Sequence, residues 1–356
     1  MITAALFLWL AFQNVSPEGA QHMQAGVEAH KQGQFDVAVK EFRKATESDP
    51  SLVEAFLDLG EVCLENRDYP AAIAALKRAL ELSPELDAAH LQLGYALLAQ
   101  GYAEEAIPHL DRVHALEALG IAQIETGRYE AAVANLSAAL AIHPGNQDLL
   151  YYLGRAGGLL SKRSIDTLIS AYPDSARAHQ AMGENYYVVR QFPQAEKEYA
   201  AALQQRPDMP ELHLELGLVY AGAADWPKAE EAFRLEAKLQ PGSAEAAYRL
   251  GTALLQQGKG QEARVELQRS DHLLPNMPET LYSLGKAASL EGDSALAEKS
   301  WTRLLAVEKD TALAAQTHFA LAALYRKAGD TAKAKQEMQE YQKLNVKILE
   351  TQNPPK

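Results

Sequence analysis

Residues 217–241 read GLVYAGAADWPKAEEAFRLEAKLQP, and residues 251–275 read GTALLQQGKGQEARVELQRSDHLLP. When the two stretches are aligned, three small or special residues coincide: Gly217 with Gly251, Ala229 with Ala263, and Pro241 with Pro275. By subtraction, all three pairs have the same step of 34 residues. One step shared by three positions predicts a structural repeat whose columns should extend along the rest of the chain.

The glycine column extends along most of the chain. Its members are Gly26, Gly60, Gly94, Gly120, Gly154, Gly183, Gly217, Gly251 and Gly285, and Ala322 takes the same place in the last repeat. By subtraction the steps are 34, 34, 26, 34, 29, 34, 34, 34 and 37 residues. The alanine column is Ala38, Ala72, Ala106, Ala132, Ala195, Ala229, Ala263, Ala297 and Ala334, and the proline column is Pro50, Pro84, Pro144, Pro173, Pro207, Pro241 and Pro275.

A helix–turn–helix unit explains each column physically. A glycine inside a helix costs about 1 kcal/mol relative to alanine, so its repetition indicates a compensating close approach of two helices. The alanine column supplies a matching small position on the second helix. Between the columns lies a turn with an aromatic residue at its end, as in TGRY at residues 126–129. The proline near the end of each repeat stops the second helix.

The period and the three columns resemble the tetratricopeptide repeat, a helix–turn–helix unit of 34 residues. The resemblance covers about residues 18–344. It predicts an all-α fold, a right-handed superhelical solenoid of about ten helix–turn–helix repeats, in which each repeat packs only on its neighbours.

Two irregular steps divide the array. Eight residues are missing between the third and fourth repeats (34 − 26), where Pro108 falls inside the second helix. Five are missing in the fifth repeat (34 − 29), near Gly157 and Gly158, and its second helix is expected to be a stub around residues 165–171. These steps predict an N-terminal arm at 17–115, a degenerate middle at 116–175 and a C-terminal arm at 176–344. Kinks in the superhelix and neutral drift of a tolerant repeat both explain them.

The two ends of the chain have their own compositions. Residues 1–16 contain the apolar run ITAALFLWLAF, which has the length of the apolar region of a signal peptide and is too short to span a bilayer. We therefore expect a periplasmic or secreted protein of a bacterium, with a cytoplasmic location as the alternative. A misplaced start codon or an apolar cap on the first repeat would also explain the run. Residues 345–356 are expected to form a disordered tail.

Charge and composition exclude several classes of function. The chain has 34 Lys and Arg against 47 Asp and Glu, a net charge of −13, so it lacks the basic surface that nucleic acids require. The same sign disfavours binding to an anionic membrane, except through the N-terminal segment. The one cysteine, Cys63, allows neither an intrachain disulfide nor a cysteine-based zinc site.

No pattern of catalytic residues stands out. Phosphate-loop, dinucleotide-binding, GxSxG and HExxH patterns are missing from the sequence. Five of the ten histidines, His22, His90, His179, His213 and His318, lie four residues before the glycine column. We expect these to replace the bulky residue that wedges the two helices apart. His109 and His114 are five residues apart, which places them on diverging faces of a helix, so a metalloenzyme centred on them is a remote alternative. We expect no enzymatic activity and no cofactor or metal.

The resemblance implies that the first helices of the repeats line the concave surface. Positions three before and one after the glycine column then provide the candidates for a groove that binds proteins or peptides: Leu57, Leu91, Tyr95, Tyr151, Leu214, Leu218, Tyr248, Tyr282 and Phe319. Acidic residues such as Glu54, Glu211, Glu245 and Glu279 flank them. Packing against the neighbouring repeat is the competing explanation, because each hairpin must bury its sides.

The family also has a mode that grips a C-terminal carboxylate with Lys and Asn on the first helices. This chain has Met23 and Val27 at the matching places of its first repeat, and later repeats do not restore the pair. We therefore predict a scaffold or adaptor that is not a co-chaperone of that type. A membrane-associated factor that helps to assemble an envelope complex, held by an uncleaved leader, is the alternative.

Overall fold

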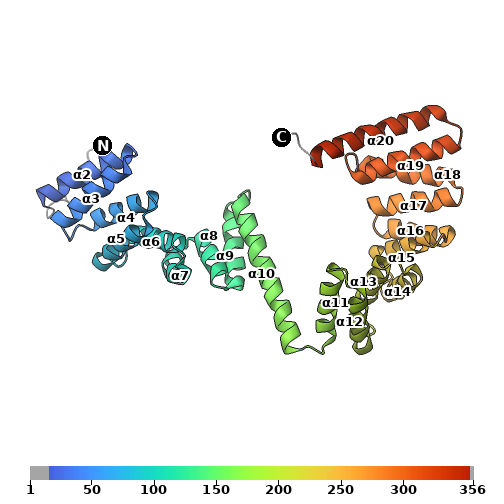
Figure 1. Cartoon of the computed structure of the whole chain (residues 1–356), viewed down its shortest axis with the longest axis horizontal. Coiled ribbons are helices and arrows are strands. Elements are labelled where there is room, and N and C mark those ends of the chain that lie inside the picture. The colour runs from blue at the N-terminus through green and yellow to red at the C-terminus, as the bar shows by residue number, and fades with distance from the viewer. Residues whose placement is uncertain (1–15, 353–356) are drawn as a thin grey trace. The chain divides into compact units, whose positions relative to one another are not determined.

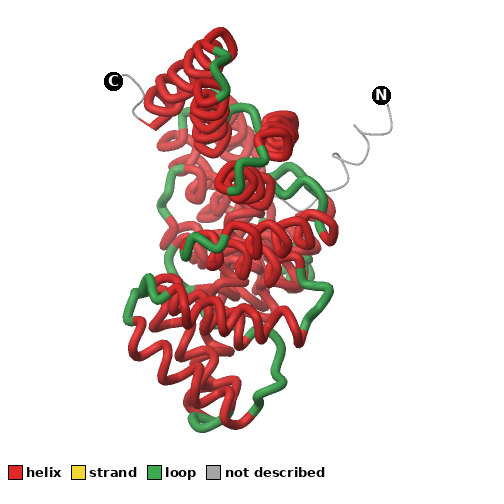
Figure 2. Tube along the Cα trace, turned by 90° about the vertical axis from the view of Figure 1, so that its right-hand side faces the viewer, coloured by secondary structure: helices red, strands yellow, loops and turns green. Residues whose placement is uncertain are grey.

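The computed structural model describes residues 16–352, which form nineteen α-helices and no strand (Figures 1 and 2). Eighteen of the helices form nine antiparallel hairpins, each made of two consecutive helices in contact, and α10 stands alone between them. The predicted all-α array of about ten repeats is confirmed, with nine hairpins and one altered repeat. The apolar leader lies outside the described residues, apart from Ser16, which caps the first helix through its side chain.

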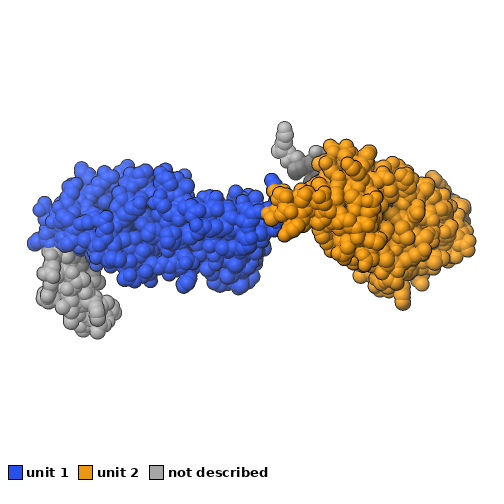
Figure 3. Space-filling model, turned by 90° about the horizontal axis from the view of Figure 1, so that it is seen from below, with its two compact units in different colours: residues 1–164 blue, residues 165–356 orange. Residues whose placement is uncertain are grey.

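The chain divides into two compact units, residues 1–164 and 165–356 (Figure 3). In the first unit the hairpins are α2 (Pro17–Lys31) with α3 (Phe35–Ser48), α4 (Val53–Glu65) with α5 (Tyr69–Leu82), α6 (Asp87–Ala99) with α7 (Ala103–Arg112), and α8 (Leu116–Glu125) with α9 (Tyr129–Ile142). The boundary falls inside α10 (Gln147–Ala171), within the predicted middle segment 116–175.

The second unit contains five hairpins. They are α11 (Ala176–Val188) with α12 (Phe192–Gln205), α13 (Leu212–Gly222) with α14 (Trp226–Leu239), α15 (Ala244–Gln256) with α16 (Gly260–Leu273), α17 (Pro278–Leu290) with α18 (Ser294–Val307), and α19 (Ala312–Lys327) with α20 (Thr331–Gln352). The predicted disordered tail is wrong for residues 345–352. These residues continue α20, because Ile348 packs on Ala314 and Ala315 with the buried Leu344.

The glycine column marks the place where a large side chain of the second helix crosses the first. A Cβ added to Gly26 would lie 2.6 Å from the ring of Phe42, and one added to Gly251 would lie 2.6 Å from Cγ of Leu267. In every hairpin that has the glycine, this neighbour is the residue sixteen positions later. The compensating close approach is therefore real, but the glycine faces a bulky side chain and not the alanine column.

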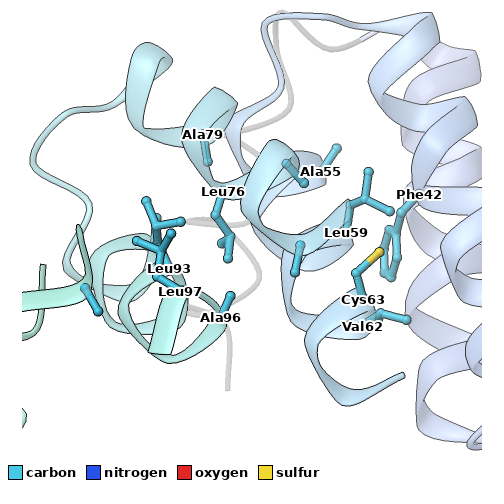
Figure 4. Packing of buried hydrophobic residues seen from close by; sticks show 14 of the residues in the cluster. Phe42, Ala55, Leu59, Val62, Cys63, Leu76, Ala79, Leu93, Ala96 and Leu97 are labelled. Carbon is cyan, nitrogen blue, oxygen red and sulfur yellow. The ribbon is translucent and has the colours of Figure 1, made fainter. Parts of the chain in front are cut away.

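The alanine column is instead buried in cores that successive hairpins share. Ala38, Ala72 and Ala106 are fully buried in unit 1, and Ala195, Ala229, Ala263 and Ala297 are fully buried in unit 2. Figure 4 shows the resulting core in unit 1, where Phe42 and Leu76 from second helices meet Leu59, Leu93 and Leu97 from first helices. Each hairpin therefore buries its side only when a neighbour covers it, as the predicted array requires.

Every hairpin turn uses one residue in the left-handed region, seven positions after the glycine column. Six of these residues are glycines with φ between +70° and +85°: Gly33, Gly101, Gly127, Gly258, Gly292 and Gly329. The other three are Arg67, Arg190 and Ala224, with φ of 60°, 59° and 59°. A left-handed residue breaks the helix and reverses the chain, and glycine adopts that conformation without the steric cost of a Cβ.

Helix α10 is the exception, and here the predicted stub helix at residues 165–171 is wrong. The residue seven after Gly154 is Ser161, which stays helical, so the chain does not turn and residues 165–171 extend α10 to a length of 25 residues. With no second helix to fold back, a Cβ added at Gly154 would meet nothing within 4 Å. The side of α10 nearest its start still packs in unit 1, where Leu149 and Ala156 are buried with Leu136 of α9.

The other irregular step shortens two helices. Helices α7 and α8 have 10 residues each, whereas their neighbours α6 and α9 have 13 and 14. Pro108 remains within α7, and the chain turns at His114, which has a φ of 51°. Relative to the second helix α5 (14 residues) and the first helix α6 (13 residues), α7 and α8 are shorter by four and three residues, and the connection at 113–115 is one residue shorter than that at 83–86. The hairpin α6–α7 keeps its glycine contact between Gly94 and Leu110.

Candidate protein-binding surface

The first helices of successive hairpins lie side by side. Contacts join α2 to α4, α4 to α6 and α6 to α8 in unit 1, and α11 to α13, α15 to α17 and α17 to α19 in unit 2. The second helices of successive hairpins make no comparable contact among residues 16–352. Helices that approach one another line the inner side of a curved array, so in each unit the first helices form the concave side. We call this side the inner surface.

Three of the nine predicted groove residues are well exposed on first helices. Tyr95 of α6, Tyr151 of α10 and Phe319 of α19 have exposed fractions of 42%, 65% and 50%. Large apolar side chains with this exposure are available to a ligand, because no neighbouring repeat covers them. Tyr151 also lies edge-on against Tyr152, with ring centroids 5.3 Å apart.

The other six predicted groove residues are half-buried, and most contribute to packing between repeats. Leu57 packs against the unit 1 core, Leu214, Leu218 and Tyr248 pack against a core in unit 2, and Tyr282 joins the cluster around Trp301. Leu91 is half-buried on α6. Most of the column therefore packs between repeats, as the competing explanation expects, whereas Tyr95, Tyr151 and Phe319 are exposed and remain candidates for binding.

In unit 1 the inner surface holds a carboxyl group with an unusual titration. Asp58 lies on α4, two positions before Gly60, and burial raises its pKa to about 6. The negative charge of Glu61 raises the pKa further, His30 opposes this and Glu54 adds to it. These groups concentrate negative charge beside Leu57, so a cationic side chain placed there would be stabilised at neutral pH.

In unit 2 the equivalent position holds Glu215 on α13, two positions before Gly217. Burial raises the pKa of Glu215 to about 7, a hydrogen bond donated by Gln180 lowers it, and the charges of Glu184 and Glu211 raise it again. Gln180 Nε2 lies 2.9 Å from Glu215 Oε1, and Arg177 donates to Gln180 Oε1 over 2.6 Å. Burial also raises the pKa of Glu184.

Asp58 and Glu215 were not among the predicted site residues. Their positions in the repeat match, since both lie two before the glycine column, and that match could have been read from the sequence. What the sequence does not show is how far the neighbouring first helices remove each carboxyl from water.

Three members of the histidine column link the two helices of their hairpins. His22, His179 and His318 reach across their hairpins to Glu41, Glu198 and Glu337, over 2.6, 2.7 and 2.6 Å. In each case the partner is nineteen residues later, on the second helix. These are polar links between the helices of a hairpin, made by residues that were expected only to fill the space of a bulky wedge.

His90, another member of the histidine column, contacts His109, which is one of the two histidines considered above as metal ligands. His90 Nδ1 lies 2.7 Å from His109 Nδ1, nineteen residues later, and His90 Nε2 lies 2.9 Å from the carbonyl oxygen of Pro84. Since that oxygen can only accept, His90 carries its proton on Nε2, and His109 then donates from Nδ1. Burial lowers the pKa of His109, as does His90. Within residues 16–352, no three His, Cys, Asp or Glu side chains gather as metal ligands.

Family comparisons fit this architecture. A family model described as tetratricopeptide repeat matches residues 23–87, 117–157, 181–244 and 222–278, and a second with the same description matches residues 64–118. The chain belongs to the tetratricopeptide repeat family. Tetratricopeptide repeat proteins are in general non-enzymatic scaffolds for protein interaction.

One curated tetratricopeptide relative is the Hsp70-Hsp90 organising protein of Plasmodium falciparum. It is 24% identical over 196 residues, which make up 54% of this chain and 31% of the relative. The chain thus matches about a third of the length of that relative.

Solved tetratricopeptide structures resemble the fold at low sequence identity. The crystal structure of MamA protein is 20% identical, with a TM-score of 0.46 over 51% of this chain and 96% of that one. The crystal structure of the APC/C hetero-tetramer Cut9-Hcn1 is 15% identical, with a TM-score of 0.44 over 97% of this chain and 90% of that one.

Two further properties concern the reactivity of Cys63 and the chance of a membrane-spanning helix. Cys63 is buried in the repeat core, where burial raises the pKa of its thiol, so it lacks the thiolate character of a nucleophile. Among the described helices, none is both long enough and apolar enough to cross a lipid bilayer.

Proposed function

We propose that this tetratricopeptide chain is a non-catalytic scaffold that binds protein segments along its inner surface. The observation that carries the proposal is the coexistence of exposed Tyr95 and Tyr151 with acidic side chains on the first helices of unit 1. An aromatic side chain that becomes fully buried contributes roughly 1.5–3 kcal/mol, and association costs on the order of 4–15 kcal/mol. A partner must therefore touch several repeats.

The side chains of the inner surface indicate what kind of partner segment would bind to it. Exposed aromatic rings suit aliphatic or aromatic side chains, and the carboxyl groups of Glu54, Asp58 and Glu61 suit Lys or Arg. The partner is thus an extended or helical segment in which apolar and basic residues alternate. Such a segment differs from an acidic C-terminal peptide, which the inner surface would repel. The Met23 and Val27 pair also lacks the Lys and Asn that grip a terminal carboxylate.

Cross-linking in cells, followed by mass spectrometry of captured proteins, tests the scaffold. Changing Tyr95 and Tyr151 together to Ala should remove the specifically captured proteins. The matched control is Tyr102→Ala, because Tyr102 is equally exposed (51%) but lies in the turn before α7, away from the inner surface. Unchanged capture in the double variant, or equal loss in the control, would contradict the proposed surface.

A periplasmic or secreted location is a separate proposal. It rests on the apolar run between Ile2 and Phe12. N-terminal sequencing of the protein from cells tests it. A start near residue 17 would support export and rule out anchoring by the leader. Retention of the run in a membrane fraction would instead favour the membrane-associated assembly factor.

A further inference from the structure

Within the described part of unit 2, the last hairpin is the one whose alanine-column side is not covered by a following hairpin. Between α19 and α20 lies a cavity of about 270 Å³, and we call its walls the terminal face, formed by Phe319, Ala323, Arg326, Ala334, Lys335 and Met338. Ala334 belongs to the alanine column and is only half-buried, whereas the column members of the other four hairpins of unit 2 are fully buried. Among the described residues, no helix covers this face.

The preceding hairpins show what kind of element covers such a face. In hairpin α17–α18, the equivalents of Ala334 and Met338 are Ala297 and Trp301, and both are buried in one cluster with Leu321 and Leu324 of α19. In hairpin α15–α16, Ala263 and Leu267 are likewise buried in one cluster with Leu284 and Ala287 of α17. The covering element is a helix that presents apolar residues three positions apart.

Polar residues flanking this interface determine its charge. The residue after the alanine column is acidic in three hairpins of unit 2, and each acid accepts a hydrogen bond from the next hairpin. Glu196 accepts from Tyr220 (3.0 Å), Glu230 from Gln257 (2.8 Å) and Glu298 from Tyr325 (2.7 Å). The acidic side chains are thus matched by donors on the element that covers them.

The one cationic example inside unit 2 follows the same rule with the opposite sign. Arg264 occupies this position in hairpin α15–α16, and the next hairpin supplies Asp293, whose Oδ2 lies 3.5 Å from Nη1 of Arg264. At this position of the repeat, each of the four charged side chains therefore pairs with a polar or oppositely charged group of the covering hairpin. In the last hairpin the position is Lys335, which is exposed and forms no ion pair with any residue in 16–352, and Arg326 beside it is in the same state.

We infer that the terminal face binds an amphipathic helix of a partner protein, with Leu, Ala or Val facing Ala334 and Met338 and an acidic residue facing Lys335. This site is separate from the inner surface of unit 1, on which the scaffold proposal rests. The helix occupies the place that α19 occupies on the preceding hairpin. Its acidic residue replaces Tyr325, since the group it meets is a cation where Tyr325 meets Glu298.

A second copy of this chain fits the face poorly. Its first helix, α2, would have to take the place of the covering helix. Interior first helices present buried residues at the contact positions, such as Ala246, Leu250 and Ala253 of α15, whereas α2 presents exposed Gln21, Ala25 and Glu28. Stacking of two copies would bury a carboxylate and an amide against Ala334 and Met338, which costs free energy unless each finds a polar partner.

A peptide that copies the covering helix tests the inference on the full chain. The probe is a helix-constrained, fluorescently labelled peptide with the sequence of Ala312–Lys327, made once unchanged and once with Tyr325→Glu. Fluorescence anisotropy should show that the acidic form binds the wild-type chain at least fivefold more tightly. In the chain, Lys335→Glu should reverse that preference, and Ala334→Arg should weaken both peptides at least tenfold. Lys343→Glu, on the same helix but outside the face, should change neither.

Three results would overturn the inference. The first is no binding of the acidic peptide to the wild-type chain. The second is binding that Ala334→Arg leaves unchanged, with circular dichroism used to show that the variant is folded. The third is a wild-type dimer in sedimentation velocity that Ala334→Arg dissociates, which would make a second copy the occupant. Since none of these variants alters Tyr95 or Tyr151, the test is independent of the test of the inner surface.

Discussion

Helix α10 and the hairpin α15–α16 begin alike and end differently. Each has a glycine of the same column, at Gly154 and Gly251, and each first helix packs on the hairpin before it. Seven residues later Gly258 turns the chain at a φ of 73°, whereas Ser161 continues the helix. The glycine therefore stabilises this protein only where a second helix packs back on the first. Its effect is to leave space for the side chain sixteen residues later, and α10 has no such neighbour at Gly154.

The largest expected effect comes from the same substitution at both glycines. Gly251→Ala places a Cβ 2.6 Å from Leu267 Cγ and 3.2 Å from the carbonyl oxygen of Ala263, and the backbone atom cannot give way. We expect it to lower the free energy of unfolding by about 1–3 kcal/mol. Gly154→Ala meets nothing within 4 Å and should raise it by about 0.5–1 kcal/mol through helix propensity.

Urea denaturation followed by circular dichroism measures both variants, and hydrogen exchange locates the change. Loss of protection in Gly251→Ala should concentrate in α15 and α16, since repeats contact only their neighbours. Destabilisation by Gly154→Ala would show that a second element packs against α10 after all.

The second prediction concerns the pH dependence of stability, because the first helices of regular hairpins pack closely and bury carboxyl groups such as that of Glu215. The pKa of Glu215 is about 7 in the folded chain against an ordinary value of 4.5, so folding favours its protonated form. Its stabilising contribution is full below pH 4.5 and is lost as the pH rises through 7. Glu215→Gln should therefore gain about 1–2 kcal/mol over the wild type at pH 8, after allowance for solvent screening, and nothing at pH 4.5.

Unfolding curves at a series of pH values check this expectation. Glu279→Gln is the control, because Glu279 is an exposed acid near the start of α17. If the curves of Glu215→Gln and wild type stay parallel from pH 4.5 to 8, the burial of this carboxyl group has no energetic consequence.

The smallest effect tests the turn itself. Gly127→Ala forces a side chain into the left-handed conformation at a φ of 74°, where no atom lies within 4 Å of the new Cβ, and should cost about 1 kcal/mol. Ser161→Ala, at the equivalent place in α10, should stabilise slightly because alanine is the better helix former. Thermal unfolding of the two variants gives the comparison, and shifts of the same sign in both would mean that the turn position does not distinguish the two regions.

Much of the fold could be predicted because it repeats. The columns at Gly26 to Gly285 predicted both the helix pairs and the close approach within them, since a costly residue kept at one period requires a common cause. The hairpin missing at α10 was not predicted, although the lack of a turn residue at Ser161 indicates it. The stub at residues 165–171 was assumed by extending the period past the point where its turn signal had gone.

The candidate site was less predictable than the fold. Tyr151 and Tyr248 occupy the same position of the repeat, yet Tyr151 is exposed while Tyr248 packs into a core, because exposure depends on the neighbouring hairpin. The link from His22 to Glu41 was also missed. Two residues nineteen positions apart meet only when the register between two antiparallel helices is known.

The helical repeat, its period and the small residues that let the helices of a hairpin meet can be read from the sequence, because these properties are local to each unit of 34 residues. Which side chains remain exposed, where carboxyl groups such as Asp58 and Glu215 leave water, and which face stays uncovered depend on the tertiary structure. Those properties arise between hairpins, where burial depends on residues far apart in the chain.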